Sequence, residues 1–209
     1  MPAQFAVLMG DIVESPNQSA DSRRHLGAHI ELGLRLIHDY IPLSYEVFRG
    51  SRFVIETEHA EQAVTIALLL RLFLKSKQQQ EDWDIRIGVG VVTQSASDYT
   101  TIKHRAEKLA EKALRTIKKE RLCIQTENND LNERLSLTTK FADALLTALT
   151  TTQAQVLSYY LRFMPMTHQA LANKLNKSRV NVTQILNSTH YKLFELYLLE
   201  AREILSMRE

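Results

Sequence analysis

The first 60 residues show apolar patterns typical of alternating strands and helices. The run FAVLMGDI at residues 5–12 is almost continuously apolar up to Gly10-Asp11, which predicts a buried strand. In SYEVFRGSRFVIET, residues 44–57, two apolar runs flank Gly50-Ser51 and predict a β-hairpin with a two-residue turn. Between them, apolar residues at helical spacing predict a helix over residues 20–40, closed by Pro42: Leu26, Ile30, Leu34 and Ile37.

Residues 60–127 predict four more elements. An amphipathic helix at 60–77 precedes the strand DIRIGVGVVT, in which Gly88 and Gly90 indicate a face that another segment approaches closely. A charged helix at 102–121 and a short strand in RLCIQTE follow. This order predicts an α+β sandwich with helices packed on one face of a mainly antiparallel sheet.

The composition of the chain changes after residue 126. The segment ENNDLNERLSLTTK, residues 127–140, is polar and has no sustained apolar period, which favours a domain boundary near residue 136. Beyond it the pattern predicts only helices, beginning with residues 141–149 and 152–163. We therefore expect an α+β domain at residues 1–136 and an all-α domain at residues 137–209.

Composition adds limits on location and partners. With 44% hydrophobic and 24% charged residues, the chain has the balance of an ordinary globular protein. Residues 1–137 hold 18 Lys and Arg against 19 Asp and Glu, whereas residues 138–209 hold 8 against 5. A single cysteine, Cys123, excludes an intrachain disulfide and fits a reducing compartment. The chain does not start with a signal-peptide pattern, and Arg71 interrupts the apolar stretch IALLLRLFL, so we expect a cytoplasmic protein without membrane contact.

The most specific pattern lies in residues 166–195, MTHQALANKLNKSRVNVTQILNSTHYKLFE. A helix-turn-helix needs a small residue where its helices cross, a turn residue that tolerates positive φ, and apolar residues on the inner face of the second helix. Ala172 fits the crossing, and Asn176 fits the turn because asparagine adopts the left-handed conformation more readily than most residues. The core contacts of the motif are filled by apolar side chains: Leu171, Leu175, Val182 and Ile185.

The outer face of this motif carries side chains suited to nucleic acid. Ser178 is a suitable N-cap for the second helix. The outward polar residues are of base-reading or phosphate-contacting types, with Arg suited to guanine and Asn or Gln to adenine: Arg179, Asn181, Thr183, Gln184 and Asn187. Flanking lysines are expected phosphate contacts: Lys174, Lys177 and Lys192. The predicted partner is double-stranded DNA, and the alternative is a three-helix bundle with a merely solvated polar surface.

Gly10-Asp11 places a carboxylate at the end of a buried strand. Such a carboxylate can hold a metal ion, or a phosphate through one, and it is equally a common way to end a strand. No other catalytic constellation is found in the sequence. Cys123 has no nearby histidine in a nucleophile pattern, the 7 histidines lack metal-ligand spacing, and no P-loop occurs.

Three motifs give the first domain a family resemblance: LMGDIVES, YEVFRGSRFVIE and IRIGVGVV. They resemble the SatD family of bacterial proteins and, through it, the class III nucleotide cyclase fold. The resemblance covers nearly the whole chain, because members of that family also look like a cyclase-like, ferredoxin-like α+β domain followed by a C-terminal helix-turn-helix. In the family and in cyclases, the strand-end aspartate and a second aspartate in the hairpin hold the metal ions for a nucleoside triphosphate.

The chain departs from that pattern at the hairpin. Asp11 matches the strand-end carboxylate, but the turn reads GSRF, so the second carboxylate is missing. Two-metal chemistry needs anionic oxygens around both ions, and Arg52 brings a cation instead. Cyclases also carry an Asn and an Arg that orient the ribose and stabilise the transition state, where this chain aligns His104 and Lys108. We therefore expect no catalysis, no bound metal and no cofactor.

Asp11, Ser51 and Arg52 remain candidates for binding a small anionic or nucleotide ligand, because Arg52 and the backbone N–H groups after the strand favour anions. The structural alternative is that Asp11 caps the following turn or pairs with Arg52. Candidate neighbours of this site are Glu14, His25 and Arg86.

From these patterns together, we interpret the protein as a cytoplasmic DNA-binding transcription regulator that acts as a homodimer. Its degenerate cyclase-like domain would mediate dimerisation or sense a ligand, and its helix-turn-helix domain would read DNA, since paired recognition helices lie about one DNA turn apart. The alternative is a nucleotide- or metal-binding protein of the SatD type with a structural helical tail.

Overall fold

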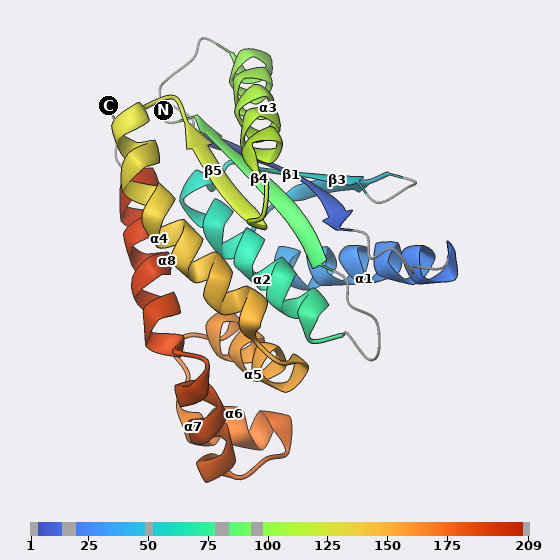
Figure 1. Ribbon diagram of the computed structural model, residues 1–209, viewed down its shortest axis with the longest axis vertical. Coiled ribbons are helices and arrows are strands. Elements are labelled where there is room, and N and C mark those ends of the chain that lie inside the picture. Colours follow the sequence, from blue (N-terminus) through green and yellow to red (C-terminus); the bar gives the residue numbers. More distant parts are fainter. Residues whose placement is uncertain (1–3, 14–19, 49–51, 78–83, 93–97, 207–209) are drawn as a thin grey trace.

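Five strands form a sheet in the order β2-β3-β1-β4-β5 at the centre of the protein (Figure 1). The computed structural model describes residues 4–13, 20–48, 52–77, 84–92 and 98–206. Its strands are β1 (Phe5–Val13), β2 (Ser44–Val47), β3 (Arg52–Thr57), β4 (Asp84–Val92) and β5 (Leu122–Thr126). Its helices are α1 (Ala20–His38), the 3-10 helix η1 (Ala60–Gln62), α2 (Ala63–Lys75), α3 (Tyr99–Thr116), α4 (Asn129–Ala148), α5 (Thr151–Arg162), α6 (His168–Leu175), α7 (Arg179–Ser188) and α8 (Tyr191–Ser206).

The α+β class and each strand expected from the sequence are confirmed. Strand β1 pairs antiparallel with β3 and β4, and β2 pairs with β3 in the same way, whereas β5 runs parallel to β4. From β1 to β4 the elements follow the β-α-β-β-α-β motif. The helix expected at 102–121 begins earlier, at Tyr99, and ends at Thr116. The hairpin turn expected at Gly50-Ser51 lies outside the described residues.

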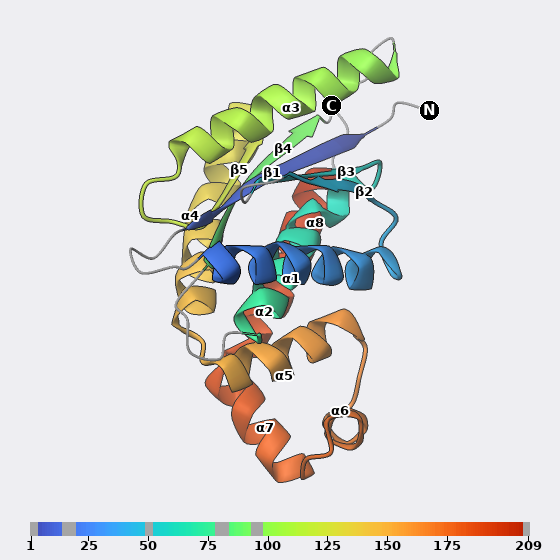
Figure 2. The ribbon, with the colours of Figure 1, turned by 90° about the vertical axis from the view of Figure 1, so that its right-hand side faces the viewer.

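Helices cover both faces of the sheet, which corrects the expected one-sided arrangement (Figure 2). Helices α1 and α2 pack on the face that buries Leu8 and Ile55, while α3 covers the opposite face, where Phe5, Val7 and Val92 are buried. A parallel pair such as β4 and β5 needs a crossover connection, and α3 supplies it. Strand β1 is apolar on both sides because both of its faces are covered.

The backbone of α3 lies directly on β4 at two glycines, as the sequence predicted. A Cβ atom on Gly90 would lie 2.1 Å from the carbonyl oxygen of Ala106 and 2.3 Å from the nitrogen of Ala110. A Cβ atom on Gly88 would lie 2.4 Å from the carbonyl oxygen of Ala110 and from the nitrogen of Leu114. Only glycine leaves room for this contact between helix and sheet.

Helix α4 runs through the position where the sequence suggested a domain boundary. Residue 136 lies in its middle, and its N-cap Asn128 accepts hydrogen bonds from the N–H groups of Asp130 and Leu131. The buried positions of α4 recur at helical spacing, but the buried Thr139 hides the apolar period in the sequence. Its hydroxyl group is hydrogen-bonded to the Tyr197 hydroxyl of α8 at 2.8 Å. The boundary expected near residue 136 therefore falls inside a continuous helix.

The core of the sheet continues into the C-terminal helices. One cluster of buried apolar residues extends from Ala6 in β1 to Leu205 in α8. Helix α2 packs against the sheet on one side and against α5 and α8 on the other, while α6 and α7 protrude at one end of the molecule (Figures 1 and 2). Among the described residues, no helix is long and apolar enough to span a membrane.

A buried arginine connects α2, β4 and α4. Arg71 of α2 has 0% exposed surface, and its guanidinium donates to both carboxylate oxygens of Asp84 in β4, at 3.4 and 2.9 Å. It also donates to Asp143 and Thr147 of α4. The second Asp143 oxygen accepts the backbone N–H of Arg121 at 2.8 Å. Burial alone would lower the pKa of Arg71, but the two carboxylates outweigh it and raise that pKa.

Asp143→Asn should therefore destabilise the whole protein. The substitution keeps the size of the side chain but leaves buried Arg71 with one carboxylate, and removing a partner from a buried ion pair costs about 3 kcal/mol. Urea unfolding followed by circular dichroism measures the change. Asp130→Asn, an exposed position on the same helix, is the control and should cost less than about 0.5 kcal/mol. Equal effects of the two substitutions would contradict the role of the buried pair.

Candidate functional site

Asp11 is held by an arginine of the neighbouring strand. The sheet register places Asp11 opposite both Arg52 of β3 and Arg86 of β4. The carboxylate accepts two hydrogen bonds from Arg86, Nε to Oδ1 at 2.8 Å and Nη2 to Oδ2 at 2.7 Å. These hydrogen bonds raise the pKa of Arg86. The structure therefore pairs Asp11 with Arg86 and not with Arg52, whose side chain is exposed.

A hollow of about 850 Å³ lies beside this ion pair, between the sheet and the C-terminal end of α3. Arg52, Arg86 and Arg115 line it together with Asp11 and Glu111, and Arg115 donates to Glu111 at 2.6 Å. Each lining carboxylate thus already has an arginine partner. A cation bound to Asp11 would have to displace the Arg86 guanidinium, whereas an anion would meet Arg52, which pairs with neither lining carboxylate.

The other candidate residues of this region do not gather here. His104 and Lys108 are exposed on α3 and do not line the hollow, and His104 lies 3.7 Å from Glu107. His25 is exposed on α1. Ser51 and Glu14 lie outside the described residues. Within the described ranges, no group of three or more His, Cys, Asp or Glu side chains is arranged to hold a metal ion.

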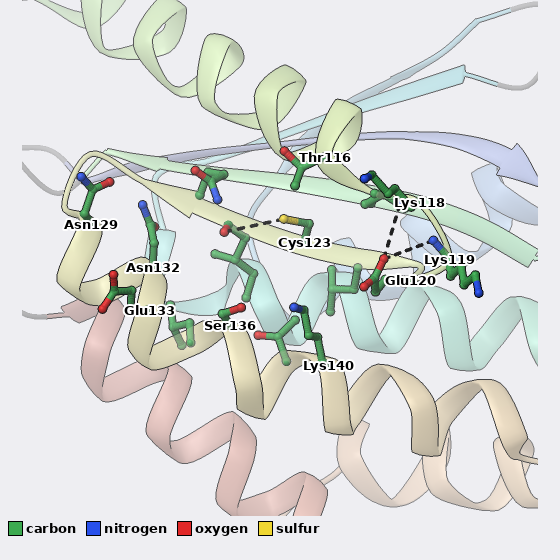
Figure 3. A pocket seen from close by; sticks show the side chains of 16 residues that line it. Thr116, Lys118, Lys119, Glu120, Cys123, Asn129, Asn132, Glu133, Ser136 and Lys140 are labelled. Atoms are coloured by element: carbon green, nitrogen blue, oxygen red, sulfur yellow. Dashed lines mark hydrogen bonds between the residues drawn. The ribbon is translucent and has the colours of Figure 1, made fainter.

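A second hollow, of about 630 Å³, lies along the outer edge of β5, between α4 and the C-terminal end of α3 (Figure 3). Asn132 of α4 reaches the strand there: its Oδ1 accepts the Thr126 N–H at 2.6 Å, and its Nδ2 donates to the Thr126 carbonyl at 3.1 Å. This amide takes the place of a neighbouring strand at one end of the edge.

Cys123 of β5 lines the same hollow. Burial raises the pKa of the Cys123 thiol, which disfavours the reactive thiolate.

Helices α6 and α7, where the sequence predicted a helix-turn-helix, are joined by a short turn and have the caps expected from the sequence. Asn176 ends α6 in the left-handed conformation, with φ 51°. Ser178 begins α7, and its side chain accepts the N–H of Asn181 at 3.2 Å. Ala172 and Val182 are fully buried between the helices. Leu186, rather than the predicted Ile185, is the second fully buried residue of α7, while Ile185 is only partly buried.

Aromatic rings attach this motif to the helices on either side of it. The ring centroid of Tyr191, in α8, lies 5.1 Å from that of Tyr160 in α5 and 5.6 Å from that of His168 in α6. The Tyr160 hydroxyl donates to Glu195 at 2.5 Å. Burial, followed by the neighbouring Glu195, raises the pKa of Tyr160, so the phenol stays protonated and can donate.

Eight of the nine predicted DNA-contacting residues are exposed, and six of these follow α6, around the turn and along α7: Lys177, Ser178, Arg179, Asn181, Gln184 and Asn187. The other three are engaged or placed elsewhere. The Thr183 hydroxyl is hydrogen-bonded to His168 Nδ1 at 3.0 Å. The Lys174 ammonium lies 4.1 Å from the centroid of the Phe163 ring. Lys192 lies in α8, outside the motif.

Two further features of this surface were not among the predictions from the sequence. Val180 is 66% exposed in the first turn of α7, between Arg179 and Asn181. The sequence prediction did not include it, because only polar residues were considered for the outer face. Residues 144–194 contain no Asp or Glu but five Lys and Arg: Arg162, Lys174, Lys177, Arg179 and Lys192. This stretch includes all of α5, α6 and α7, so the protruding end of the protein carries no acidic side chain.

Comparisons with protein-family models, with curated proteins and with solved structures found no match for the chain.

Asp11 lies opposite two arginines and pairs with one of them, so matched substitutions of the two arginines test the pairing. Arg86→Gln should lower the free energy of unfolding by about 1 kcal/mol, because it removes a bidentate pair at a partly exposed position. Arg52→Gln occupies the equivalent position on the other side of Asp11, and we expect a change under about 0.3 kcal/mol because Arg52 does not pair with it. Thermal and urea unfolding measure both. If Arg52→Gln lowers the free energy of unfolding more than Arg86→Gln does, Asp11 pairs with Arg52 and the assignment is wrong.

Proposed function

We propose that the protein is a DNA-binding transcription regulator that inserts α7 into the major groove of double-stranded DNA. The observation that carries the proposal is the charge of its protruding end: residues 144–194, which contain the helix-turn-helix, hold five Lys and Arg and no acidic residue. Nucleic-acid binding is driven largely by cations that neutralise phosphates, and a nearby carboxylate would oppose it.

The geometry of α7 supports a division of roles among its side chains. At 100° per residue, Val180, Asn181, Gln184 and Asn187 lie on one face, opposite the buried Val182. In the major groove, Asn and Gln match adenine, and an apolar side chain matches the thymine methyl group. Gln184 occupies the centre of that face, so it is the residue best placed to read a base.

Phosphate contacts fall to the turn and to the start of α7. Lys177 precedes the N-cap and is exposed, and Arg179 lies at the flank of the first turn. The free backbone N–H groups at the N-terminus of a helix also favour a phosphate. We assign no phosphate contact to Lys174 or Lys192, because Lys174 lies over Phe163 and Lys192 lies beyond the motif.

We further propose that the regulator is a homodimer whose sheet domain is a cyclase-like relic of the SatD type, acting in the cytoplasm. The β-α-β-β-α-β order from β1 to β4 supports this description of the domain. Dimerisation would place two α7 helices on successive turns of DNA. The alternative, a nucleotide- or metal-binding protein with a structural tail, has less support because both Asp11 oxygens are engaged by Arg86.

Selection from a random pool of duplexes, followed by anisotropy titration, tests the proposal. Gln184→Ala should weaken binding to the selected duplex by about 1–3 kcal/mol and relax the base preference at one position. Lys177→Gln should weaken all duplexes alike and lower the slope of log affinity against log salt by about one.

Both side chains are exposed, so both variants should keep the parent's circular dichroism and melting temperature. If the two variants bind every duplex as tightly as the parent does, α7 does not read DNA and the structural interpretation of the tail replaces ours.

A further inference from the structure

A groove of about 840 Å³ lies where the helix-turn-helix joins the rest of the protein. It is bounded by the end of α1, by η1 and α2, by the end of α5 and by α8. Its lining includes Arg162, Met164 and Pro165, which lead into α6, and Lys192, which follows α7. Both chain segments that hold the motif therefore contribute to the wall of the groove.

Large apolar side chains are left open to solvent along this groove. Tyr40 is 50% exposed, Met164 43%, Leu196 62% and Leu199 53%, and all four line it. Scattered exposed apolar residues are normal, but a contiguous set in a concave site marks a binding surface. The volume is in the range of pockets that hold small organic molecules, about 300–1,000 Å³.

The charges of the groove indicate what such a molecule carries. Three cations line it, Arg162, Lys192 and Arg202, against the single carboxylate of Glu195. That carboxylate already accepts the Tyr160 hydroxyl. The Arg162 guanidinium lies 4.5 Å from the centroid of the Tyr40 ring, and its Nε is buried without a hydrogen-bond partner. A buried unpaired donor of a cation is costly unless an acceptor reaches it.

We propose that this groove binds a small organic anion with an apolar body, the body lying on Tyr40, Leu196 and Leu199 and the acidic group facing the cations. We further propose that this is the ligand the regulator senses, a step that rests on the proposed function. The ligand site is then the junction with the helix-turn-helix and not the strand-end Asp11. Occupancy would act on DNA binding through the segments before α6 and after α7.

Two fluorescent probes of the same ring system test the site on the full chain without DNA. The first, 8-anilinonaphthalene-1-sulfonate, is an apolar anion, and N-phenyl-1-naphthylamine is its neutral counterpart. Leu199→Glu should weaken binding of the anionic probe about tenfold, because it removes apolar contact and adds a negative charge. Leu193→Glu is the matched control, since Leu193 is 52% exposed on the same helix but does not line the groove. It should change the affinity less than about twofold.

The charge preference is tested separately with Arg202→Gln. This variant should weaken the sulfonate about threefold or more and leave the neutral probe within about twofold. Equal effects of the two leucine variants would mean that the probe binds elsewhere and would overturn the site. Equal effects of Arg202→Gln on both probes, or tighter binding of the neutral one alone, would overturn its preference for an anion.

A final titration separates the site from its regulatory role. A saturating concentration of 8-anilinonaphthalene-1-sulfonate should change the affinity of the parent for its selected duplex about threefold or more. The same addition should leave the duplex affinity of Leu199→Glu unchanged. An unchanged affinity in the parent would overturn the sensing role. If the parent binds no duplex at all, the proposed function fails, and the probe titrations still decide whether the groove is a binding site.

Discussion

The fold depends on one buried cation. Arg71 lies in the middle of α2, fully enclosed, and its guanidinium is neutralised by Asp84 of β4 and Asp143 of α4. An isolated charge in this place would be too costly to bury, so the three elements must come together for any of them to be stable there. Because Asp143 also accepts the Arg121 N–H just before β5, the same cluster positions the edge strand of the sheet.

This constraint explains how the protruding helix pair α6 and α7 is attached to the sheet. The buried cluster fixes α4 against α2 and the sheet, and α8 packs along α4 through the bond from Thr139 to Tyr197. Helices α5 and α8 both pack on this assembly and are connected through α6 and α7, and the rings of Tyr160 and Tyr191 pack against His168 of α6. Helices α6 and α7 are therefore held by two anchored helices, α5 and α8. Both of these helices also line the groove that includes Arg162 and Leu199, so they connect the groove to α6 and α7.

Sequence patterns predicted what depends on local periodicity and missed what depends on distant partners. The strands, the helix caps at Asn176 and Ser178 and the close approach at Gly88 and Gly90 follow from residue type and spacing, and they are confirmed. The boundary expected near residue 136 falls inside α4, because the buried face of this helix includes the polar Thr139, and the hydrogen bond from Thr139 to Tyr197 cannot be predicted from the sequence. No spacing reveals that α3 lies on the second face of the sheet, since that depends on the parallel pairing of β5.

The candidate sites show the same division. The outward side chains of α7 follow from its helical period, whereas Lys174 lies over Phe163 and Asp11 binds Arg86, choices that the sequence leaves open. Amide hydrogen exchange on the full chain, with and without its selected duplex, tests the central claim most directly. We expect DNA to slow exchange in peptides covering residues 173–187 and to leave β1 and β3 near Asp11 unchanged. Slower exchange around Asp11 with none in α7 would contradict the account.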